Sequence, residues 1–369
     1  MNRRALIKDA GLLVSGLALG SVGGYLSSRG ETVQNPLYTT VTRLLTQTQT
    51  ITQSPTPRIS ELRIGFVPNL YRAPIYMGEK YGVFARYGLN PTRVEVPAGS
   101  GPSIEALISG TVDITSIDWV SVLKLAESRG IHLKVVHNWL VMGSYKGQKS
   151  NPNHGAALIV KKDSKIEKLE QLKGKKVAIN ALNALPHMSL SILLNKVGVN
   201  PSKDVEWVEV AFNRMPGPLS AGQVDAAVMI EPFLTLVISQ DIGRAVVDPP
   251  VLPYPNLYLP TFGDPLFVTG YFTSEQIWNN KREAIRNTVA ALADCIRYMY
   301  GDIEDTIKTT AKELNVNENI VEKALSGGFF VANPEGFKDH KMLDNQVKAL
   351  TEIGFLQKEI DTSKFALEL

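Results

Sequence analysis

The side chains best suited to bind a ligand lie in loops that follow predicted strands. The Gly99-Ser100-Gly101-Pro102 loop is the clearest, because glycines let a backbone approach a ligand closely and proline favours the first turn of a helix. Free N–H groups at such a helix start can bind a carboxylate, a sulfonate or a similar anion. The same loop could instead be a plain helix cap in which Ser100 serves the backbone. It is not a phosphate-binding Walker loop, because the lysine and Ser/Thr of that motif are missing.

Charged and aromatic side chains in the neighbouring loops extend this set. Arg72 and Arg214 could hold an anion by paired hydrogen bonds, although a lone arginine is usually exposed. Tyr71, Trp119 and Phe233 could stack on a flat ligand, although aromatic residues are usually core. The candidate ligand-binding residues are Asn69, Tyr71, Arg72, Ser100, Gly101, Asp118, Trp119, Asn183, His187, Arg214 and Glu231.

Three of these residues could also act as acids or bases. His187 lies at a predicted helix start, and Glu231 before Pro232 could accept a hydrogen bond from a ligand amine or cap a helix. With Asp118 they could serve an exported enzyme, which is the alternative to a binding protein. No Gly-x-Ser-x-Gly, His-Glu-x-x-His or metal-spaced cluster accompanies them. We therefore expect no catalytic residues, no cofactor and no metal.

A repeated unit of strand, loop and helix positions these loops. From Glu61 onward, short apolar runs alternate with helical patterns, which predicts an α/β fold of mostly parallel sheets flanked by helices. The pattern recurs about 113 residues later: Ile64-Gly65-Phe66 matches Val177-Ala178-Ile179, and the Leu-x-x-Gly-x-Val-Asp turn at 107–113 matches that at 219–225. We expect two similar lobes. Because ligands bind beyond the carboxyl ends of parallel strands, the loops of both lobes should border one cleft.

The chain is expected to cross between the lobes twice. Residues 58–161 and 260–369 are predicted to form the first lobe, and residues 162–259 the second lobe with the return crossing. Residues 248–265 are crowded with proline and tyrosine and cannot form a regular helix, which fits such a crossing. Two crossings predict a hinged clamshell.

The first 57 residues predict export. Residues 1–30 combine Arg3, Arg4 and Lys8 with a Gly-rich apolar run, which is typical of an export signal or an N-terminal membrane anchor, and the arginine pair resembles a twin-arginine signal. Residues 31–57 are rich in Thr, Gln, Ser and Pro and predict a flexible stalk. The rest of the chain should therefore lie outside the cytoplasm, as a periplasmic or cell-surface protein.

The charge balance and the lone cysteine exclude other classes of protein. Of the 39 Lys and Arg residues five lie in residues 1–57, and of the 36 Asp and Glu residues two do, so 34 of each sign remain beyond. A neutral body argues against nucleic-acid binding. Cys295 alone rules out an intrachain disulfide or a Cys-based metal site, and it lies on a predicted amphipathic helix, where packing is its usual role.

Several motifs in order resemble a known family. They are the Leu62–Asn69 segment with Ala73-Pro74, the repeated turn, Leu169-x-x-Leu-Lys-Gly-Lys-Lys-Val-Ala-Ile, Met215-Pro216 and Glu231-Pro232-Phe233. Together they resemble the substrate-binding proteins of nitrate/sulfonate/taurine-type ABC importers, a group that includes binders of thiamine pyrimidine precursors. The resemblance runs from about residue 61 to 239 and more loosely to the C-terminus. The sequence lacks the cysteine-rich motif of the related pyrimidine-synthesising enzymes and the lipid-bearing cysteine common among bacterial relatives.

The resemblance implies a two-lobe periplasmic-binding-protein fold of type 2, with ligand contacts in the loops named above. It implies a monomer that captures a small solute and delivers it to a membrane permease driven by an ATPase. The anion donors favour a sulfonate, nitrate or taurine-like ligand. The aromatic residues leave open a planar heterocycle such as a pyrimidine precursor or a flavin.

Overall fold

Two sheets organise the part of the chain that the computed structural model describes, which is residues 59–367 apart from 97–98, 329 and 337. The six-stranded sheet has the order β13-β4-β12-β3-β1-β2, and the five-stranded sheet has the order β11-β7-β10-β8-β9. The predicted export signal and stalk lie outside the described residues. The strands of the first sheet are β1 (Ser60–Phe66), β2 (Leu89–Glu95), β3 (Ile114–Asp118), β4 (Lys134–Met142), β12 (Leu266–Thr273) and β13 (Val331–Ala332). Those of the second are β7 (Ala156–Lys161), β8 (Lys175–Ile179), β9 (Val205–Glu209), β10 (Ala226–Ile230) and β11 (Gly243–Ala245).

The two sheets repeat one topology. The run β4-β12-β3-β1-β2 corresponds strand by strand to β11-β7-β10-β8-β9, with parallel pairs β1–β2, β1–β3, β8–β9 and β8–β10 in matching places. The α/β prediction and the sequence repeat are thus both confirmed. The sheets are mixed instead of mostly parallel as predicted, because β12 and β7 lie antiparallel to their neighbours. The short strand β13 was not expected.

The repeat extends to a side-chain contact. Asp113, just before β3, accepts a hydrogen bond from the backbone N–H of Arg63, while its own N–H donates to the Arg63 carbonyl. Asp225, just before β10, makes the same pair of bonds with Lys176. In both sheets the aspartate of the repeated turn therefore fixes where the third strand of the unit meets the first.

The buried Asp113 should contribute more stability than its counterpart. Burial would raise the pKa of Asp113, but hydrogen bonds from Arg63 and an ion pair with Lys281 outweigh it and lower that pKa. We expect Asp113→Asn to reduce the free energy of unfolding at pH 7 by about 2 kcal/mol, measured by denaturant titration. Asp225→Asn should reduce the free energy of unfolding by less than Asp113→Asn does, because the Asp225 side chain is 39% exposed.

The pH dependence follows from the lowered pKa. A depressed carboxyl pKa contributes stability above the pKa of the unfolded chain, and that contribution disappears as the pH falls through the folded value. The difference in the free energy of unfolding between wild type and Asp113→Asn should therefore become smaller below a pH of about 4. A gap that stays constant down to pH 2 would contradict the role of the Asp113 charge.

The two crossings enter the sheets through the antiparallel strands. The first runs through the hairpin of β5 (Ser144–Tyr145) and β6 (Gln148–Lys149) into β7, and the second runs from β11 to β12. The sequence-based boundary after residue 161 is corrected here, because β7 pairs with β10 and belongs to the five-stranded sheet. The proline-rich segment contains one short helix, α9 (Leu259–Phe262).

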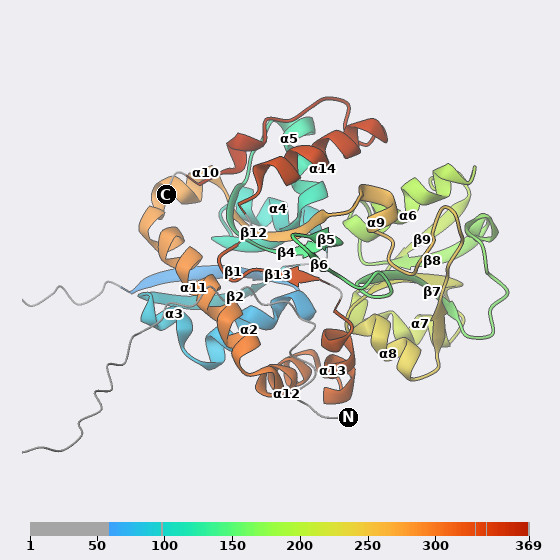
Figure 1. Ribbon diagram of the computed structural model, residues 1–369, viewed down its shortest axis with the longest axis horizontal. Helices are drawn as coiled ribbons and strands as arrows, with labels where there is room; N and C mark the ends of the chain where they lie inside the picture. Colours follow the sequence, from blue (N-terminus) through green and yellow to red (C-terminus); the bar gives the residue numbers. More distant parts are fainter. Residues whose placement is uncertain (1–58, 97–98, 329, 337, 368–369) are drawn as a thin grey trace, which may run out of the picture. The chain divides into compact units, whose positions relative to one another are not determined.

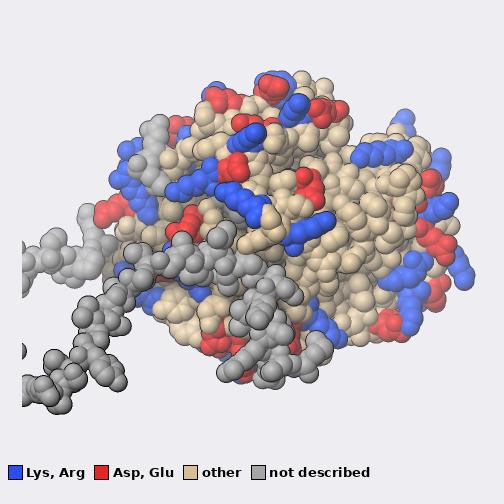
Figure 2. Space-filling view, viewed as in Figure 1, with Lys and Arg blue, Asp and Glu red and all other residues tan. Residues whose placement is uncertain are grey.

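Helices cover the sheets, as Figure 1 shows, with α6, α7 and α8 beside the five-stranded sheet. The helices are α2 (Ala73–Lys80), α3 (Val83–Arg86), α4 (Ser100–Ile108), α5 (Trp119–Arg129), α6 (Leu185–Lys196), α7 (Pro216–Ser220), α8 (Phe233–Ser239), α10 (Glu275–Asn280), α11 (Arg282–Gly301), α12 (Ile303–Leu314), α13 (Glu318–Ser326) and α14 (His340–Glu352). Short 3-10 turns lie at Leu70–Arg72, Leu169–Leu172, Phe212–Arg214 and Thr362–Phe365. None of the helices in the described ranges is long and apolar enough to cross a membrane. Basic and acidic side chains alternate over the face in Figure 2, in keeping with the neutral body.

Candidate functional site

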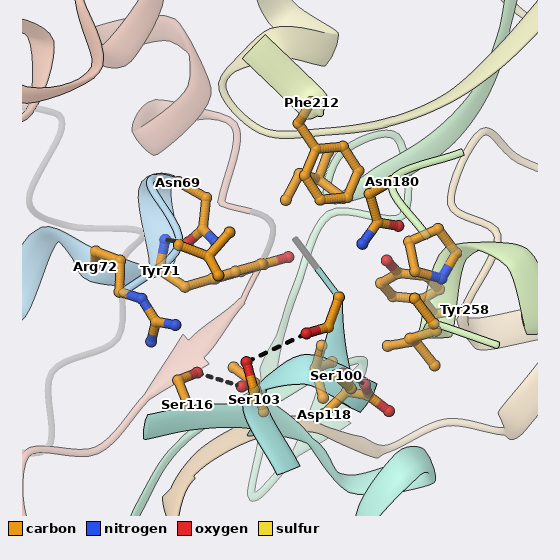
Figure 3. A pocket seen from close by; sticks show the side chains of 18 residues that line it. Asn69, Tyr71, Arg72, Ser100, Ser103, Ser116, Asp118, Asn180, Phe212 and Tyr258 are labelled. Atoms are coloured by element: carbon orange, nitrogen blue, oxygen red, sulfur yellow. Dashed lines mark hydrogen bonds between the residues drawn. The ribbon is translucent and has the colours of Figure 1, made fainter. Parts of the chain in front are cut away.

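A cavity of about 100 Å³ lies where loops of the two sheets meet (Figure 3). One side is built by loops that follow β1 and β2 and by the end of β3, and the other by segments that follow β8 and β9 and by the last residue of β10. Strand β12 and the second crossing complete it, through Thr269 and Tyr258. The cavity therefore lies at the carboxyl ends of the repeated strands, where parallel sheets bind ligands. The lining residues are Val67, Asn69, Tyr71, Arg72, Gly99, Ser100, Ser103, Ser116, Asp118, Asn180, Ala184, Leu185, Pro186, Phe212, Ile230, Tyr258, Val268 and Thr269.

Arg72 is the cation of this lining. Its turn begins at Asn69, whose side chain accepts a hydrogen bond from the Tyr71 N–H at 3.0 Å. The guanidinium is 2% exposed and lies over the Tyr271 ring, 5.8 Å from its centroid. Among the described residues no carboxylate pairs with it, and Nε and Nη1 have no hydrogen-bond partner. Because arginine stays charged, this leaves a buried positive charge with donors to spare.

Asp118 is the carboxylate of the lining. It ends β3 and caps α5, accepting hydrogen bonds from the Ser121 N–H at 2.7 Å and the Ser121 hydroxyl at 2.8 Å. The Ser100 hydroxyl also donates to it, from the start of α4. Burial raises the pKa of Asp118, and these hydrogen bonds oppose the shift without cancelling it. Asp118 is thus partly a structural cap and partly a pH-sensitive group beside the cavity.

The wall from the five-stranded sheet is mostly apolar. Leu185, Phe212 and Ile230 line it, with the amide of Asn180 among them. In Figure 3 the Tyr71 ring extends into the middle of the cavity, opposite Asn180. The Asn180 Oδ1 atom is buried with no hydrogen-bond partner in the described structure. An occupant would therefore meet polar groups from one sheet and an apolar wall with one amide from the other.

Five of the predicted residues line this cavity: Asn69, Tyr71, Arg72, Ser100 and Asp118. All five come from the first half of the repeat. The loop glycine at the cavity is Gly99 instead of Gly101. A Cβ on Gly99 would lie 2.7 Å from the Ala181 Cβ, so this glycine permits close approach of the neighbouring loop.

Trp119 does not line the cavity. Its ring packs edge-on against Phe272 and Phe365, with centroid distances of 4.8 and 5.6 Å. Its indole N–H donates to the Asn138 side chain at 3.1 Å. It is a core residue at the start of α5.

The four residues predicted from the second half of the repeat also lie away from the cavity lining. The Asn183 N–H donates to His187 Nδ1 at 3.0 Å, and the His187 ring packs edge-on against Trp207. Arg214 is exposed. Glu231 is fully buried but contacts His154 and the α8 backbone. Of the proposed acid–base set of Asp118, His187 and Glu231, only Asp118 lines the cavity.

Sequence reasoning missed the lining residues of the second wall. Asn180 directly follows β8, as Val67 follows β1, so the repeat could have indicated it. Phe212 and Tyr258 had no such signal, because an aromatic residue in a loop is usually core. Among the described residues, no group of three or more His, Cys, Asp or Glu could hold a metal ion.

Comparisons with known proteins agree with this architecture. The model of the NMT1-like family matches residues 56–315. The protein YtlA of Bacillus subtilis is 24% identical over 179 residues, which is 48% of this chain and 50% of that protein, so the match spans half the length of that relative.

Two solved structures share the fold. The alkanesulfonate-binding protein SsuA of Xanthomonas axonopodis, bound to MOPS, superposes with a TM-score of 0.63 at 19% identity, covering 83% of this chain and 98% of that one. A Candida albicans protein described as having the generic periplasmic-binding-protein fold gives a TM-score of 0.63 at 16% identity, covering 84% and 96%. At these identities the likeness establishes the periplasmic-binding-protein fold.

Proposed function

Because the chain belongs to the NMT1-like family, we propose that it is the solute-binding component of an ABC-type importer, with a small organic anion as its ligand. It would work outside the cytoplasm and deliver the solute to a membrane permease. The observation that carries the ligand class is Arg72, a buried guanidinium that lines the cavity without a carboxylate partner among the described residues.

The charge of the cavity selects the ligand. A buried unpaired ion is costly in free energy, so an anion that pairs with Arg72 would gain both charge neutralisation and hydrogen bonds. Asp118 in the same lining would repel a second negative charge. Burial raises the pKa of the Tyr71 and Tyr258 hydroxyls, which therefore stay protonated at neutral pH. These groups together favour a ligand with a single negatively charged group, such as a sulfonate, nitrate or a taurine-like zwitterion.

Capture would use the two lobes. Residues from both sheets line the cavity, so each lobe alone would present only half of the contacts. A hinge motion at the two crossings would open the cavity to solvent and close it around the solute. This is consistent with a binding protein that must also release its ligand.

Aromatic side chains support a second ligand class. Tyr71, Phe212 and Tyr258 line the cavity and could sandwich a small planar heterocycle. A cavity of about 100 Å³ suits a single ring better than a flavin. A pyrimidine is therefore the alternative to the anion.

A thermal-shift screen of the whole chain distinguishes the candidates, because a ligand that binds the folded state raises its melting temperature. The panel contains ethanesulfonate, taurine, nitrate, bicarbonate, flavin mononucleotide and an aminopyrimidine. We expect a sulfonate to raise the melting temperature. A shift from the aminopyrimidine alone would favour the heterocycle, and no shift from any member at millimolar concentration would contradict the proposed function.

The pH dependence of binding should follow Asp118. Its raised pKa means that it takes up a proton above the ordinary range of an aspartate, after which it no longer repels an anion. We expect the affinity for ethanesulfonate, which has no proton to donate, to increase as the pH falls below neutral, measured by calorimetry. Asp118→Asn keeps a side chain that can cap α5 and should remove this dependence. An affinity that falls with the pH in wild type would place the anion away from Asp118.

A further inference from the structure

Glu231 and His154 form a contact outside the cavity, between the end of β10 and the first crossing. The Glu231 side chain is fully buried, and its Oε1 accepts a hydrogen bond from His154 Nδ1 at 2.8 Å. Its Oε2 accepts from the Thr235 N–H, and its own backbone N–H donates to the Gly155 carbonyl. Because the residue before it, Ile230, lines the cavity, this contact fixes one wall of the site.

The same segment is tied to the second crossing. The Asn256 Nδ2 donates to the His154 carbonyl at 2.7 Å, and the Asn256 N–H donates to the Pro152 carbonyl at 3.0 Å. The Asn256 Oδ1 accepts from the Tyr258 N–H at 2.9 Å. Tyr258 also lines the cavity. A short chain of contacts therefore runs from one cavity residue through both crossings to another.

His154 also lies against the end of α13. A Cβ added to Gly327, which follows α13, would lie 2.6 Å from the His154 Nδ1 and Cε1 atoms. The Asn151 N–H donates to the Gly328 carbonyl at 2.7 Å. The imidazole therefore lies against both Gly327 and Glu231, and its Nδ1 atom is close to each of them.

We propose that the His154–Glu231 pair is a positioning latch that sets ligand affinity without touching the ligand. The pair holds both crossings, the end of α13 and the end of β10 in the arrangement in which residues of both sheets line one cavity. The inference rests on the proposed function, because it concerns the binding at that cavity. An affinity measured on a protein that populates its competent arrangement only in part falls in proportion to that fraction.

Gly327→Ala tests the latch without altering either member. Gly327 has a helical φ of −62°, so alanine can adopt its backbone, and the added methyl group must displace the imidazole. We expect about tenfold weaker binding of the sulfonate that the screen identifies, from loss of a charge-assisted hydrogen bond. Gly301→Ala is the matched control. Gly301 is the last residue of α11, and a Cβ added to it would have no atom within 4 Å. The affinity of Gly301→Ala should equal that of wild type.

Substitutions at His154 separate the latch from general packing. His154→Ala should weaken binding like Gly327→Ala, whereas His154→Asn places an amide N–H near the position of Nδ1 and should restore most of the affinity. In the double variant with His154→Ala, the Gly327 substitution should have no further effect, because no ring remains to be displaced. Full affinity in folded His154→Ala, or no rescue by asparagine, would overturn the proposal.

Hydrogen exchange of the unliganded protein tests the latch independently of any ligand. The amides of Glu231 and Asn256 should exchange about tenfold faster in Gly327→Ala and His154→Ala, while those of β8 stay unchanged. If no solute binds wild type but this acceleration is seen, the positioning of the two crossings by the His154–Glu231 pair stands and the proposed function fails. Unchanged exchange at both amides would overturn the latch even if sulfonates bind.

Discussion

Arg72→Met should abolish ligand binding and leave the unliganded protein at least as stable as wild type. Methionine fills much of the same volume without charge, so it removes a cation that is 2% exposed and lacks a carboxylate partner among the described residues. Replacing an unsatisfied buried charge by an apolar group is often neutral or stabilising. The loss of two charge-assisted hydrogen bonds to the ligand should weaken binding more than about 100-fold. Calorimetry and thermal unfolding of the same samples measure the two effects.

Arg214→Met is the control, since that arginine is exposed and outside the cavity lining. Its binding should be unchanged, which reverses the expectation from the sequence. If Arg72→Met still bound the sulfonate within a fewfold of wild type, or if Arg214→Met lost binding, the anion site would lie elsewhere.

Trp119→Ala should lower the free energy of unfolding by about 3–5 kcal/mol. Ligand binding by the folded variant should be unchanged. The indole is buried between Phe272 and Phe365 and has its hydrogen bond to Asn138, so truncation creates a cavity in the core. For a domain of this size the melting temperature should fall by roughly 5–15 °C. Binding is then measured by calorimetry well below the new melting temperature, where the variant is folded. A normal melting temperature together with lost binding would instead make Trp119 a ligand contact.

Leu182→Ala is the control for the loss of stability expected in Trp119→Ala. Leu182 is 50% exposed, so its truncation should change the melting temperature little. The contrast tests whether burial in the aromatic cluster, and not side-chain size, causes the effect at Trp119.

The repeat made much of the fold and half of the site predictable. Asn69 and Arg72 follow β1 and Asp118 ends β3, and the carboxyl ends of parallel strands bring such positions together whatever their sequence separation. Each of these residues is also polar, so its side-chain chemistry and its position in the predicted fold both indicate a ligand-binding residue. The duplication then implied a second set of loops on the other side of the cavity.

The second wall was not predictable, because polarity is a poor guide where the wall is apolar. Arg214 and His187 were chosen for their chemistry, yet the turns that carry them place Phe212 and Leu185 at the cavity. Glu231 directly follows β10, close to the place that Asp118 takes at the end of β3, but its hydrogen bonds with His154 and Thr235 direct it into the crossing. Tyr258 comes from a proline-rich segment whose path depends on tertiary contacts such as Asn256, which no local pattern shows.

A crystal structure of the whole chain with the sulfonate identified by the screen tests the central claim most directly, because sulfur can be located by its anomalous scattering. We predict sulfonate oxygens within about 3 Å of Arg72 Nε and Nη1, with Tyr71 and Asn180 on either side of the ligand. A sulfonate bound outside this cavity, or inside it with the Arg72 guanidinium still unpartnered, would contradict an anion site at Arg72.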